Sequence, residues 1–256
     1  MTAIDLEGVV TAAGLIGLRV GGLMLFAPFF SNQSILPQVK VTLTVLLTVL
    51  LYPAMHLPML HLTLAQLLPL AMSEMIVGLL LGLAVTAVFD AAQLAGYVLS
   101  IQMGFSLASM FDPTTQADTP IISVFYQTMT MLIFLRMDVH YWLLRGVAHS
   151  FSYLPPGTAT LHGAAVGLLM QQASGIFLAG IQIAAPVLAA TMIADLTLGF
   201  IGRASPQLPV MMIGLSVKTV LGVTVIIATL AMWPTMLEHY FGAAVSTGER
   251  LMHLSQ

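Results

Sequence analysis

The feature that most limits what this chain can fold into is a series of long apolar stretches with few charges in them. The first runs from residue 9 to residue 30 and contains one charged side chain, Arg19. As a helix with a rise of about 1.5 Å per residue, it would measure about 33 Å, enough to cross a hydrocarbon core about 30 Å thick. Lipid offers no hydrogen-bond partners to an open backbone, so a chain that crosses it must satisfy its own backbone groups. These stretches predict an all-α integral membrane protein.

The composition supports this class. Charged residues make up 7% of the 256 residues and hydrophobic residues 59%, whereas average soluble domains carry about 25% charged residues. A formal net charge of −3 argues against a nucleic-acid partner, which would require a basic surface. The chain has no Cys, which excludes disulfides, thiol catalysis and cysteine-ligated metals. The start "MTAIDLEG" is acidic where a cleaved secretory signal would be basic, so we expect the first apolar stretch to be retained.

Prolines and charged residues divide the chain into further apolar stretches. Residues 41–52 are short for a span and precede Pro53, so they would cross a membrane only if the helix continued through a kink. Asp118 and Thr119 before Pro120 are typical of a helix start. The segments "RMDVHYWLLRG" and "SYLPPGT" predict turns, and "DLTLGFIGRASPQLP" is expected to separate the last two stretches. The other stretches are 64–101, which contains Pro69, Glu74 and Asp90, then 120–135, 164–194 and 208–237. We find no linker or repeat, so the sequence indicates a single membrane domain over residues 1–256.

Six charged residues lie inside these stretches or at their edges. An ionised side chain at the centre of a membrane helix costs about 2.5–3.5 kcal/mol on insertion scales, so six facing lipid would cost about 15–20 kcal/mol. That is comparable to the stability of a whole domain. These residues must therefore be paired, lie near the membrane surface, or face protein or water. They are Arg19, Glu74, Asp90, Asp195, Arg203 and Lys218.

The charges have a functional and a structural interpretation. They could line a polar pathway or an assembly interface, or Arg19 and Lys218 could extend to the membrane surface while the acids cap helices. We favour a buried pairing role for Glu74 and Asp195, and an interfacial structural role for Arg203 and Lys218. Two ion pairs are open from the sequence, Arg19–Glu74 and Asp195–Arg203. Three pairs of glycines at four-residue spacing also predict close helix packing: Gly17/Gly21, Gly78/Gly82 and Gly163/Gly167.

The motifs of common enzyme classes are missing. The chain has no phosphate-binding G-x-x-x-x-G-K-[ST] motif, no zinc-binding H-E-x-x-H motif and no G-x-S-x-G nucleophile turn. His56 and His61 are five residues apart, off the spacing that would place two metal ligands on one face of a helix. We therefore expect no enzyme activity, no cofactor and no metal site.

Five blocks of sequence are more specific than composition. The first, "GLRVGGLMLFAPFFSNQSILPQVKVTL", has Arg, then an apolar residue with Pro, then Pro-x-x-Lys, and the second, "SEMIVGLLLGL", has Glu-x-x-x-Gly-x-x-x-Gly. The third, "AGYVLSIQMGFSLASMFDP", has Gln-x-Gly-apolar-x-x-Ala followed by Asp-Pro. The fourth is "FLRMDVHYWLL" with the turn "SFSYLPPG", and the fifth, "ADLTLGFIGRASPQLPVMMIGLSVK", has Leu-Gly, then Arg-x-x-Pro-Gln and a downstream Lys. The matching residues include Arg19, Pro28, Pro37, Lys40, Glu74, Gly78, Gly82, Gln102, Gly104, Ala108, Asp112, Pro113 and Arg203.

In these blocks, and over essentially its whole length, the chain resembles the FliR family of the flagellar export apparatus, whose injectisome counterpart is SctT. It departs from the family pattern at Val139, where members often have Gly, and at Pro209, where they often have Asn. The Arg-x-x-Pro-Gln block favours flagellar over injectisome service.

The resemblance implies a non-enzymatic subunit of the flagellar type III protein export gate. It implies kinked helical hairpins packed in a multi-subunit helical assembly, with residues 1–155 similar to a FliP-like part and residues 156–256 similar to a FliQ-like part. The implied partners are FliP-like and FliQ-like subunits, FlhB-like and FlhA-like export components, unfolded protein substrates and membrane lipid. The implied location is the bacterial inner membrane, within the flagellar basal body. Neighbouring subunits would also shield the buried charges.

The segment Met103–Pro120, "MGFSLASMFDPTTQADTP", is the longest polar-leaning interruption of the apolar sequence. From its residues alone it is either a surface connection between helices or an element that closes a channel. The resemblance implies a plug loop from about Gly104 to Thr119, in which Phe105, Met110 and Phe111 are candidate obstructing side chains. Apolar side chains at a constriction exclude water and ions. Gly104 would let the chain leave the helix, and Asp112-Pro113 would fix a turn.

A different class of function is a secondary transporter, with Glu74, Asp90 or Asp195 as an intramembrane ion site. Two related halves with broken helices would support it, and the sequence shows no such repeat.

Overall fold

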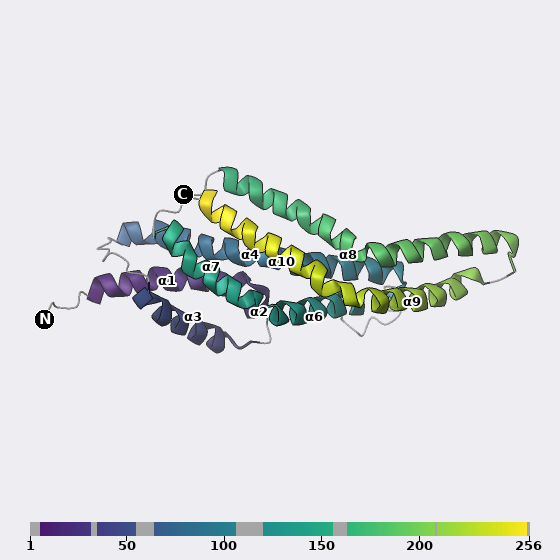
Figure 1. Cartoon of the computed structure of the whole chain (residues 1–256), viewed down its shortest axis with the longest axis horizontal. Coiled ribbons are helices and arrows are strands. Elements are labelled where there is room, and N and C mark those ends of the chain that lie inside the picture. The colour runs from purple at the N-terminus through teal and green to yellow at the C-terminus, as the bar shows by residue number, and fades with distance from the viewer. Residues whose placement is uncertain are drawn as a thin grey trace. The chain divides into compact units, whose positions relative to one another are not determined.

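The computed structural model describes residues 6–31, 35–54, 64–105, 120–155, 163–207 and 209–254. Every regular element in these ranges is a helix, which confirms the predicted all-α class. The helices in chain order are α1 (Leu6–Phe26), α2 (Pro28–Ser31), α3 (Pro37–Leu51), η1 (Tyr52–Ala54), α4 (Leu64–Gln102), α6 (Ile121–Arg136), α7 (Val139–Tyr153), α8 (Gly163–Ala204), α9 (Val210–Thr229), η2 (Leu230–Met232) and α10 (Trp233–Leu254) (Figure 1).

The chain forms two compact units, each assembled from segments that are far apart in the sequence. Unit 1 comprises Met1–Ala87, Met137–Gln172 and Phe241–Gln256, and unit 2 comprises Val88–Arg136 and Ala173–Tyr240. Helices α4, α8 and α10 each contribute to both units. The predicted likeness of residues 1–155 and 156–256 to two kinds of partner subunit is a different division, by resemblance rather than by contact, and it stays a prediction.

Four helical stretches of the described residues are long and apolar enough to cross a membrane, and a fifth arises if Ile121–Arg136 and Val139–Ser152 count as one broken span. The stretches Gln66–Gln102, Met170–Ala204 and Met212–Gly248 contain 37, 35 and 37 residues. A span requires about 20 residues, so each of these helices is longer than the hydrocarbon core needs. By length and composition, the predicted membrane protein is confirmed.

In unit 1, α1 packs side by side with α3 and, on another face, against the N-terminal part of α4 (Figure 1). A Cβ atom on Gly22 would lie 2.4 Å from the carbonyl oxygen of Met75, and one on Gly78 would lie 1.9 Å from the carbonyl oxygen of Arg19. The two backbones are therefore in direct contact, which only glycine permits. The close packing predicted at Gly78 is confirmed, whereas Gly22, its counterpart on α1, was not singled out from the sequence.

Helix α3 begins with Pro37 in its first turn, where the missing N–H costs nothing, and ends at Leu51 before the 3₁₀ turn that contains Pro53. Its 15 residues make about 22 Å of helix, still shorter than a hydrocarbon core. The predicted limit at Pro53 is therefore correct.

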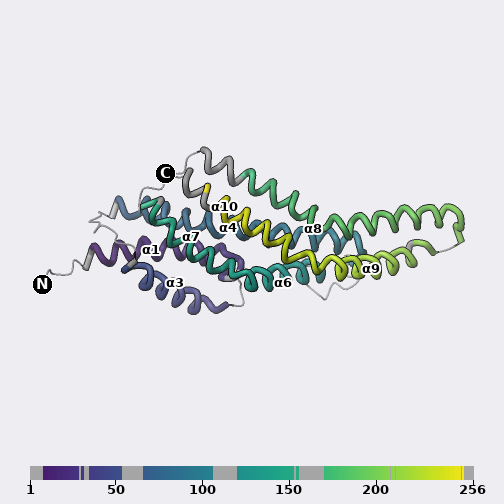
Figure 2. Tube along the Cα trace, in the orientation of Figure 1, coloured from purple at the N-terminus to yellow at the C-terminus, as the bar shows by residue number. Residues whose placement is uncertain are grey.

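Unit 2 is built around an aromatic cluster and the hairpin of α8 and α9, whose path Figure 2 traces from green to yellow-green. The rings of Tyr126 and Trp233 have centroids 4.4 Å apart, and Phe125 packs edge-on against both. A Cβ atom on Gly96 of α4 would lie 2.5 Å from the Cα atom of Ser123, so α6 and α4 also meet backbone to backbone.

Two predicted turns are shorter than the sequence suggested. The segment "DLTLGFIGRASPQLP" was expected to separate two apolar stretches, but its first ten residues continue α8 to Ala204. Its polar side chains are satisfied on the helix, since the hydroxyl of Thr197 donates to the carbonyl oxygen of Ile193 at 2.9 Å. In "RMDVHYWLLRG" the break covers only Met137 and Asp138, because Asp138 adopts a left-handed conformation with φ 55°.

The predicted helix start near Pro120 is correct, since α6 begins at Ile121 and the N–H of Val124 donates to the carbonyl oxygen of Pro120 at 3.2 Å. The capping residues Asp118 and Thr119 lie outside the described residues.

The contact between α1 and α4 generates a stability prediction. Gly22→Ala should destabilise the protein by about 1–3 kcal/mol, because the added methyl group collides with the backbone of Met75. The matched control is Gly14→Ala on the same helix, where a Cβ atom meets nothing within 4 Å and helix propensity favours Ala. The measurement is the thermal unfolding midpoint in mild detergent. Equal midpoints for the two variants would contradict the close approach.

Candidate functional site

Arg19 lies at the centre of a buried polar network in unit 1. Its side chain is 0% exposed, and all three guanidinium nitrogens donate hydrogen bonds. Nε donates to Oε2 of Glu74 at 2.6 Å, Nη1 to Oγ of Ser150 at 2.9 Å, and Nη2 to the carbonyl oxygen of Leu154 at 3.0 Å. The ring of Phe151 lies under the guanidinium, with its centroid 4.0 Å from Cζ, which adds a cation–π contact.

This network, which we call the arginine network (Arg19, Glu74, Ser150, Phe151 and Leu154), joins α1, α4, α7 and the residue that follows α7. Glu74 is also 0% exposed, so the ion pair is shielded from water and from lipid by the chain itself. Of the two ion pairs open from the sequence, the structure therefore contains Arg19–Glu74. The expectation that neighbouring subunits shield these two charges is wrong, because helices of unit 1 already cover both.

A second polar group lies in unit 2, where α4 ends. Nε2 of Gln102 donates to Oδ2 of Asp195 at 2.9 Å, and Nζ of Lys218 lies 2.9 Å from Oδ1 of the same carboxylate. We call Gln102, Asp195 and Lys218 the polar clamp. It ties the last residue of α4 to both α8 and α9. One residue further along, the hydroxyl of Thr219 donates to the carbonyl oxygen of Met103 at 3.0 Å.

Asp195 does not pair with Arg203, the partner left open by the sequence. The two residues lie on one helix, eight positions apart, which separates them by about 12 Å along the axis. Arg203 is exposed near the end of α8, whereas Lys218 is mostly buried and Asp195 is 44% exposed. A pair with this much exposure contributes about 0–1 kcal/mol, so the polar clamp positions the end of α4 more than it stabilises the unit.

The predicted plug loop is only partly within the described residues. Gly104 has φ +85°, a conformation that favours glycine, and a Cβ atom there would also displace the side chain of Leu215, whose Cδ1 would lie 1.9 Å away. Phe105 packs against the core of unit 2, which includes Leu99 and Met103. The other predicted plug residues, Met110, Phe111, Asp112 and Pro113, lie outside the described residues. Their obstructing role stays a prediction.

The carboxylates proposed for a transporter are not gathered into a site. Glu74 is bound by Arg19, Asp195 is bound by Gln102 and Lys218, and Asp90 is exposed on α4. Within the described ranges, no group of three or more His, Asp or Glu side chains could hold a metal ion. These residues offer no ion-coordinating arrangement to a transported ion.

Two members of the arginine network could not be identified from the sequence. Ser150 and Leu154 are 131 and 135 residues away from Arg19 and belong to no motif that indicates a guanidinium partner. For Lys218 the sequence predicts an interfacial structural role, without indicating Asp195 as its partner. Gln102 was identified within a motif, and the missing information was its partner across 93 residues.

Comparisons with known proteins show similarity over most of the chain. Residues 10–244 match the model of the family described as "Bacterial export proteins, family 1". Among similar proteins, the "Flagellar biosynthetic protein FliR" of Escherichia coli (strain K12) is 29% identical over 224 residues, 88% of this chain and 86% of the relative. The protein of that name from Bacillus subtilis (strain 168) is 28% identical over 243 residues, 94% of each chain. That from Aquifex aeolicus (strain VF5) is 26% identical over 179 residues, 70% and 69% of the two chains.

The arginine network generates a prediction about buried charge. Arg19→Met should cost about 3–5 kcal/mol of unfolding free energy, because it leaves the carboxylate of Glu74 buried without the positive charge that balances it. The double variant Arg19→Met/Glu74→Leu should cost less, about 1–3 kcal/mol, since no unbalanced charge stays buried and the carbonyl oxygen of Leu154 and the hydroxyl of Ser150 lose a neutral hydrogen bond's worth of stabilisation. Denaturation of the four proteins of the cycle measures the coupling.

The control for this cycle is Arg203→Met, which removes an exposed charge and should change stability by no more than about 0.5 kcal/mol. A double variant that is as unstable as the sum of both single variants would mean that the two side chains do not interact.

Proposed function

The chain belongs to family 1 of the bacterial export proteins, and on that premise we propose that it is a non-enzymatic subunit of the flagellar type III export gate. The family and its FliR relatives support a membrane-embedded component of the flagellar export apparatus. Within it, the chain contributes to the channel for unfolded export substrates. Its proposed companions are FliP-like and FliQ-like subunits, beside FlhB-like and FlhA-like components, in the bacterial inner membrane at the flagellar basal body.

The observation that carries this proposal is the mixed surface of the α8–α9 hairpin in unit 2. Large apolar side chains are exposed along it, with Phe200 73% and Met212 76% exposed. Asp195 is partly exposed on the same stretch of α8 as the exposed side chains of Ile193 and Leu196. Lipid tails would suit the apolar residues but would leave the exposed guanidinium of Arg203 unsatisfied and the polar clamp of Asp195 partly open to hydrocarbon. Companion protein chains can cover the apolar residues and supply hydrogen bonds to the charges.

The length of α8 also indicates that protein, rather than lipid alone, surrounds this helix. The apolar part of α8, Met170–Ala204, has 35 residues and would measure about 52 Å as a helix, well beyond a hydrocarbon core of about 30 Å. Residues beyond the core remain apolar, so they need a protein surface rather than water around them. Neighbouring helices of an assembly supply such a surface.

We assign the segment 104–119 the role of a plug that helps close the channel. The resemblance supplies the role, and the support from the described residues lies at its start. Gly104 turns the chain out of α4 in a conformation that other residues rarely adopt, while the polar clamp fixes the preceding turn to α8 and α9. A plug requires such a fixed base, because a free loop could not hold a constriction closed.

The first test is the composition of the native complex. A tagged chain purified in mild detergent should bring with it several FliP-like and FliQ-like chains, because the apolar face of the hairpin needs companions. Phe200→Glu should reduce the recovered companions, since it places a charge on that face. Gln38→Glu adds the same charge at an exposed polar position of α3 and should leave recovery unchanged. Recovery only as a free, well-folded monomer would overturn the proposal.

The second test concerns the plug. Deletion of Ser106–Thr115 should make membranes that contain the assembled complex leaky to ions and small molecules, because bulky side chains no longer fill the channel. Replacement of the same ten residues by Gly and Ser keeps the connection but removes the bulk, and it should leak as well. The measurement is ion flux into vesicles that contain equal amounts of complex. Tight membranes in both cases would remove the plug role and leave the subunit assignment intact.

A further inference from the structure

The exposed surface of the last helical stretch changes from apolar to polar at η2. Before that point, large apolar side chains are exposed along α9 and η2, among them Ile227 at 67% and Met232 at 69%. From residue 233 to residue 250, no large apolar side chain that the structure describes is exposed. The apolar side chains of α10 are directed into the protein instead, and Leu237 and Phe241 are both buried.

The outward side of α10 carries polar and ionisable side chains along the length of the helix. With 3.6 residues per turn, successive side chains are about 100° apart, which places all of these residues within about half of the helix circumference. The buried residues Leu237, Phe241 and Ala244 lie on the opposite half. We call the exposed set the polar face of α10, and it consists of Thr235, Glu238, His239, Ser246, Thr247 and Arg250.

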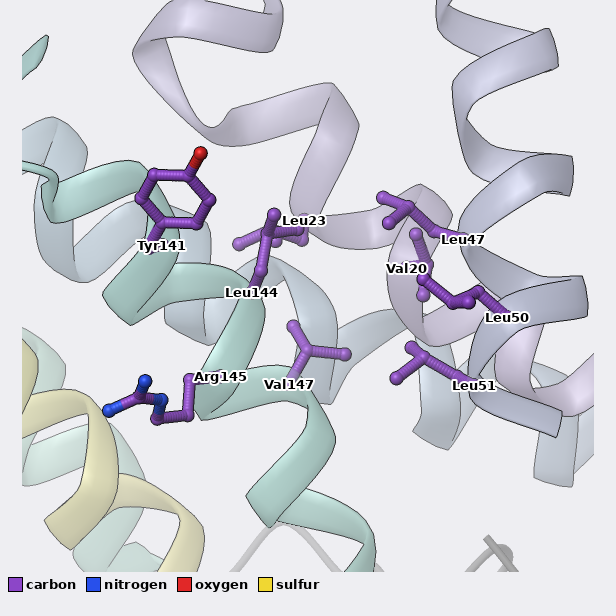
Figure 3. Close-up of a pocket in the computed structure, with 9 residues that line it drawn as sticks. All are labelled: Val20, Leu23, Leu47, Leu50, Leu51, Tyr141, Leu144, Arg145 and Val147. Carbon is purple, nitrogen blue, oxygen red and sulfur yellow. The ribbon is translucent and has the colours of Figure 1, made fainter. Parts of the chain in front are cut away.

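Helix α3 of unit 1 has the opposite kind of surface. Figure 3 shows Leu47, Leu50 and Leu51 of α3 along one side of an apolar slot that side chains of α1 and α7 also line. Over residues 41–51 the only polar side chains are threonines, and their hydroxyls donate to carbonyl oxygens of the same helix. This part of α3 therefore needs no water around it, whereas α10 exposes ionisable side chains.

Lipid does not suit the polar face of α10. Ionised Glu238 and Arg250 would be costly in hydrocarbon, because nothing there replaces their hydration. Helix α9 has 20 residues and measures about 30 Å, which already equals the thickness of a hydrocarbon core. Helix α10 adds 22 residues after the three of η2, so a bilayer that α9 crosses does not need α10 as well.

A companion subunit does not suit this face either. The buried centres of protein interfaces are enriched in Tyr, Trp, Phe and Met and depleted of Glu and Ser. The polar face of α10 contains Glu, Ser and Thr, and none of the four enriched residue types. The α8–α9 hairpin, for which we propose companions, instead exposes Phe200 and Met212. Water is the medium that fits the side chains of the polar face.

We propose that the polar face of α10 borders water in the assembled protein, and that the outward surface of this stretch passes from apolar surroundings to water at η2. The apolar stretch Met212–Gly248, long enough by itself to cross a membrane, then contacts an apolar medium only along α9 and η2. Helix α8 is not included, because it still exposes Phe177 and Leu178. The water border does not depend on the export-gate role, since it follows from the side chains that α10 exposes.

The test measures how fast a water-soluble reagent reaches single cysteines, and the chain has no Cys of its own to interfere. Thr235→Cys and Ser246→Cys each place a thiol on the polar face, and Val220→Cys and Ile227→Cys each place one at an exposed apolar position of α9. The assembled complex stays in membranes that are opened to both sides and is labelled with a sulfonated maleimide. Because a thiol must ionise to react, the α10 positions should react at least about tenfold faster than the α9 positions.

Equal rates at the four positions would overturn the proposal. Slow labelling of both α10 positions that becomes fast in detergent would mean that lipid covers the face, and slow labelling that persists until the complex is dissociated would mean that a companion subunit covers it. Either result would also overturn the proposal.

A second measurement needs no thiol. The hydroxyl of Ser246 donates only to the carbonyl oxygen of Ala243, one turn away on the same helix, so its replacement disturbs no distant contact. Ser246→Lys should leave the amount of assembled complex in the membrane unchanged, because a hydrated position accepts a charge. Ile227→Lys, the matched control on α9, should reduce that amount several-fold. An equal loss of complex in the two variants would contradict the water border.

Discussion

The energetic cost of a charge in apolar surroundings is the constraint on which this structure depends. For Arg19 this cost is offset inside unit 1. Its three guanidinium nitrogens donate hydrogen bonds to three oxygen atoms, and the ring of Phe151 stacks on the guanidinium. The partners come from α4, α7 and the residue after α7, so one side chain joins segments that the sequence keeps far apart. A buried pair of this kind adds little net stability compared with apolar packing, but it penalises every arrangement in which the partners are separated.

The same cost applies to the remaining charged side chains, which differ in whether their partners lie within the described part of the chain. Asp195 finds Gln102 and Lys218 within unit 2, and their bonds fix the end of α4. Neither Arg145 nor Arg203 has an acidic partner among the described residues. In our proposal, companion subunits supply hydrogen bonds to Arg203. The charges therefore contribute both to contacts within the chain and to the proposed contacts with companion subunits.

Backbone contact is what makes the arginine network possible. Gly22 and Gly78 let α1 and α4 approach until no side chain fits between them, and this places Arg19 of one helix beside Glu74 of the other. Gly96 has the same effect on α4 and α6 in unit 2. Small residues therefore set the distance between helices in both units. The polar side chains then determine how far one helix is shifted along the other.

The sequence by itself determined the class, the helix start after Pro120, the stop before Pro53 and the family, because these follow from local composition, proline geometry and ordered motifs. It also identified Glu74 and Gly78 within one motif and predicted close packing at Gly78. Only the tertiary structure decided that Ser150 and Leu154 complete the site of Arg19, that Asp195 takes Lys218, and that α8 continues to Ala204. The reason is distance along the chain: these contacts join residues up to 135 positions apart, and no local pattern encodes which distant partner a charge will meet.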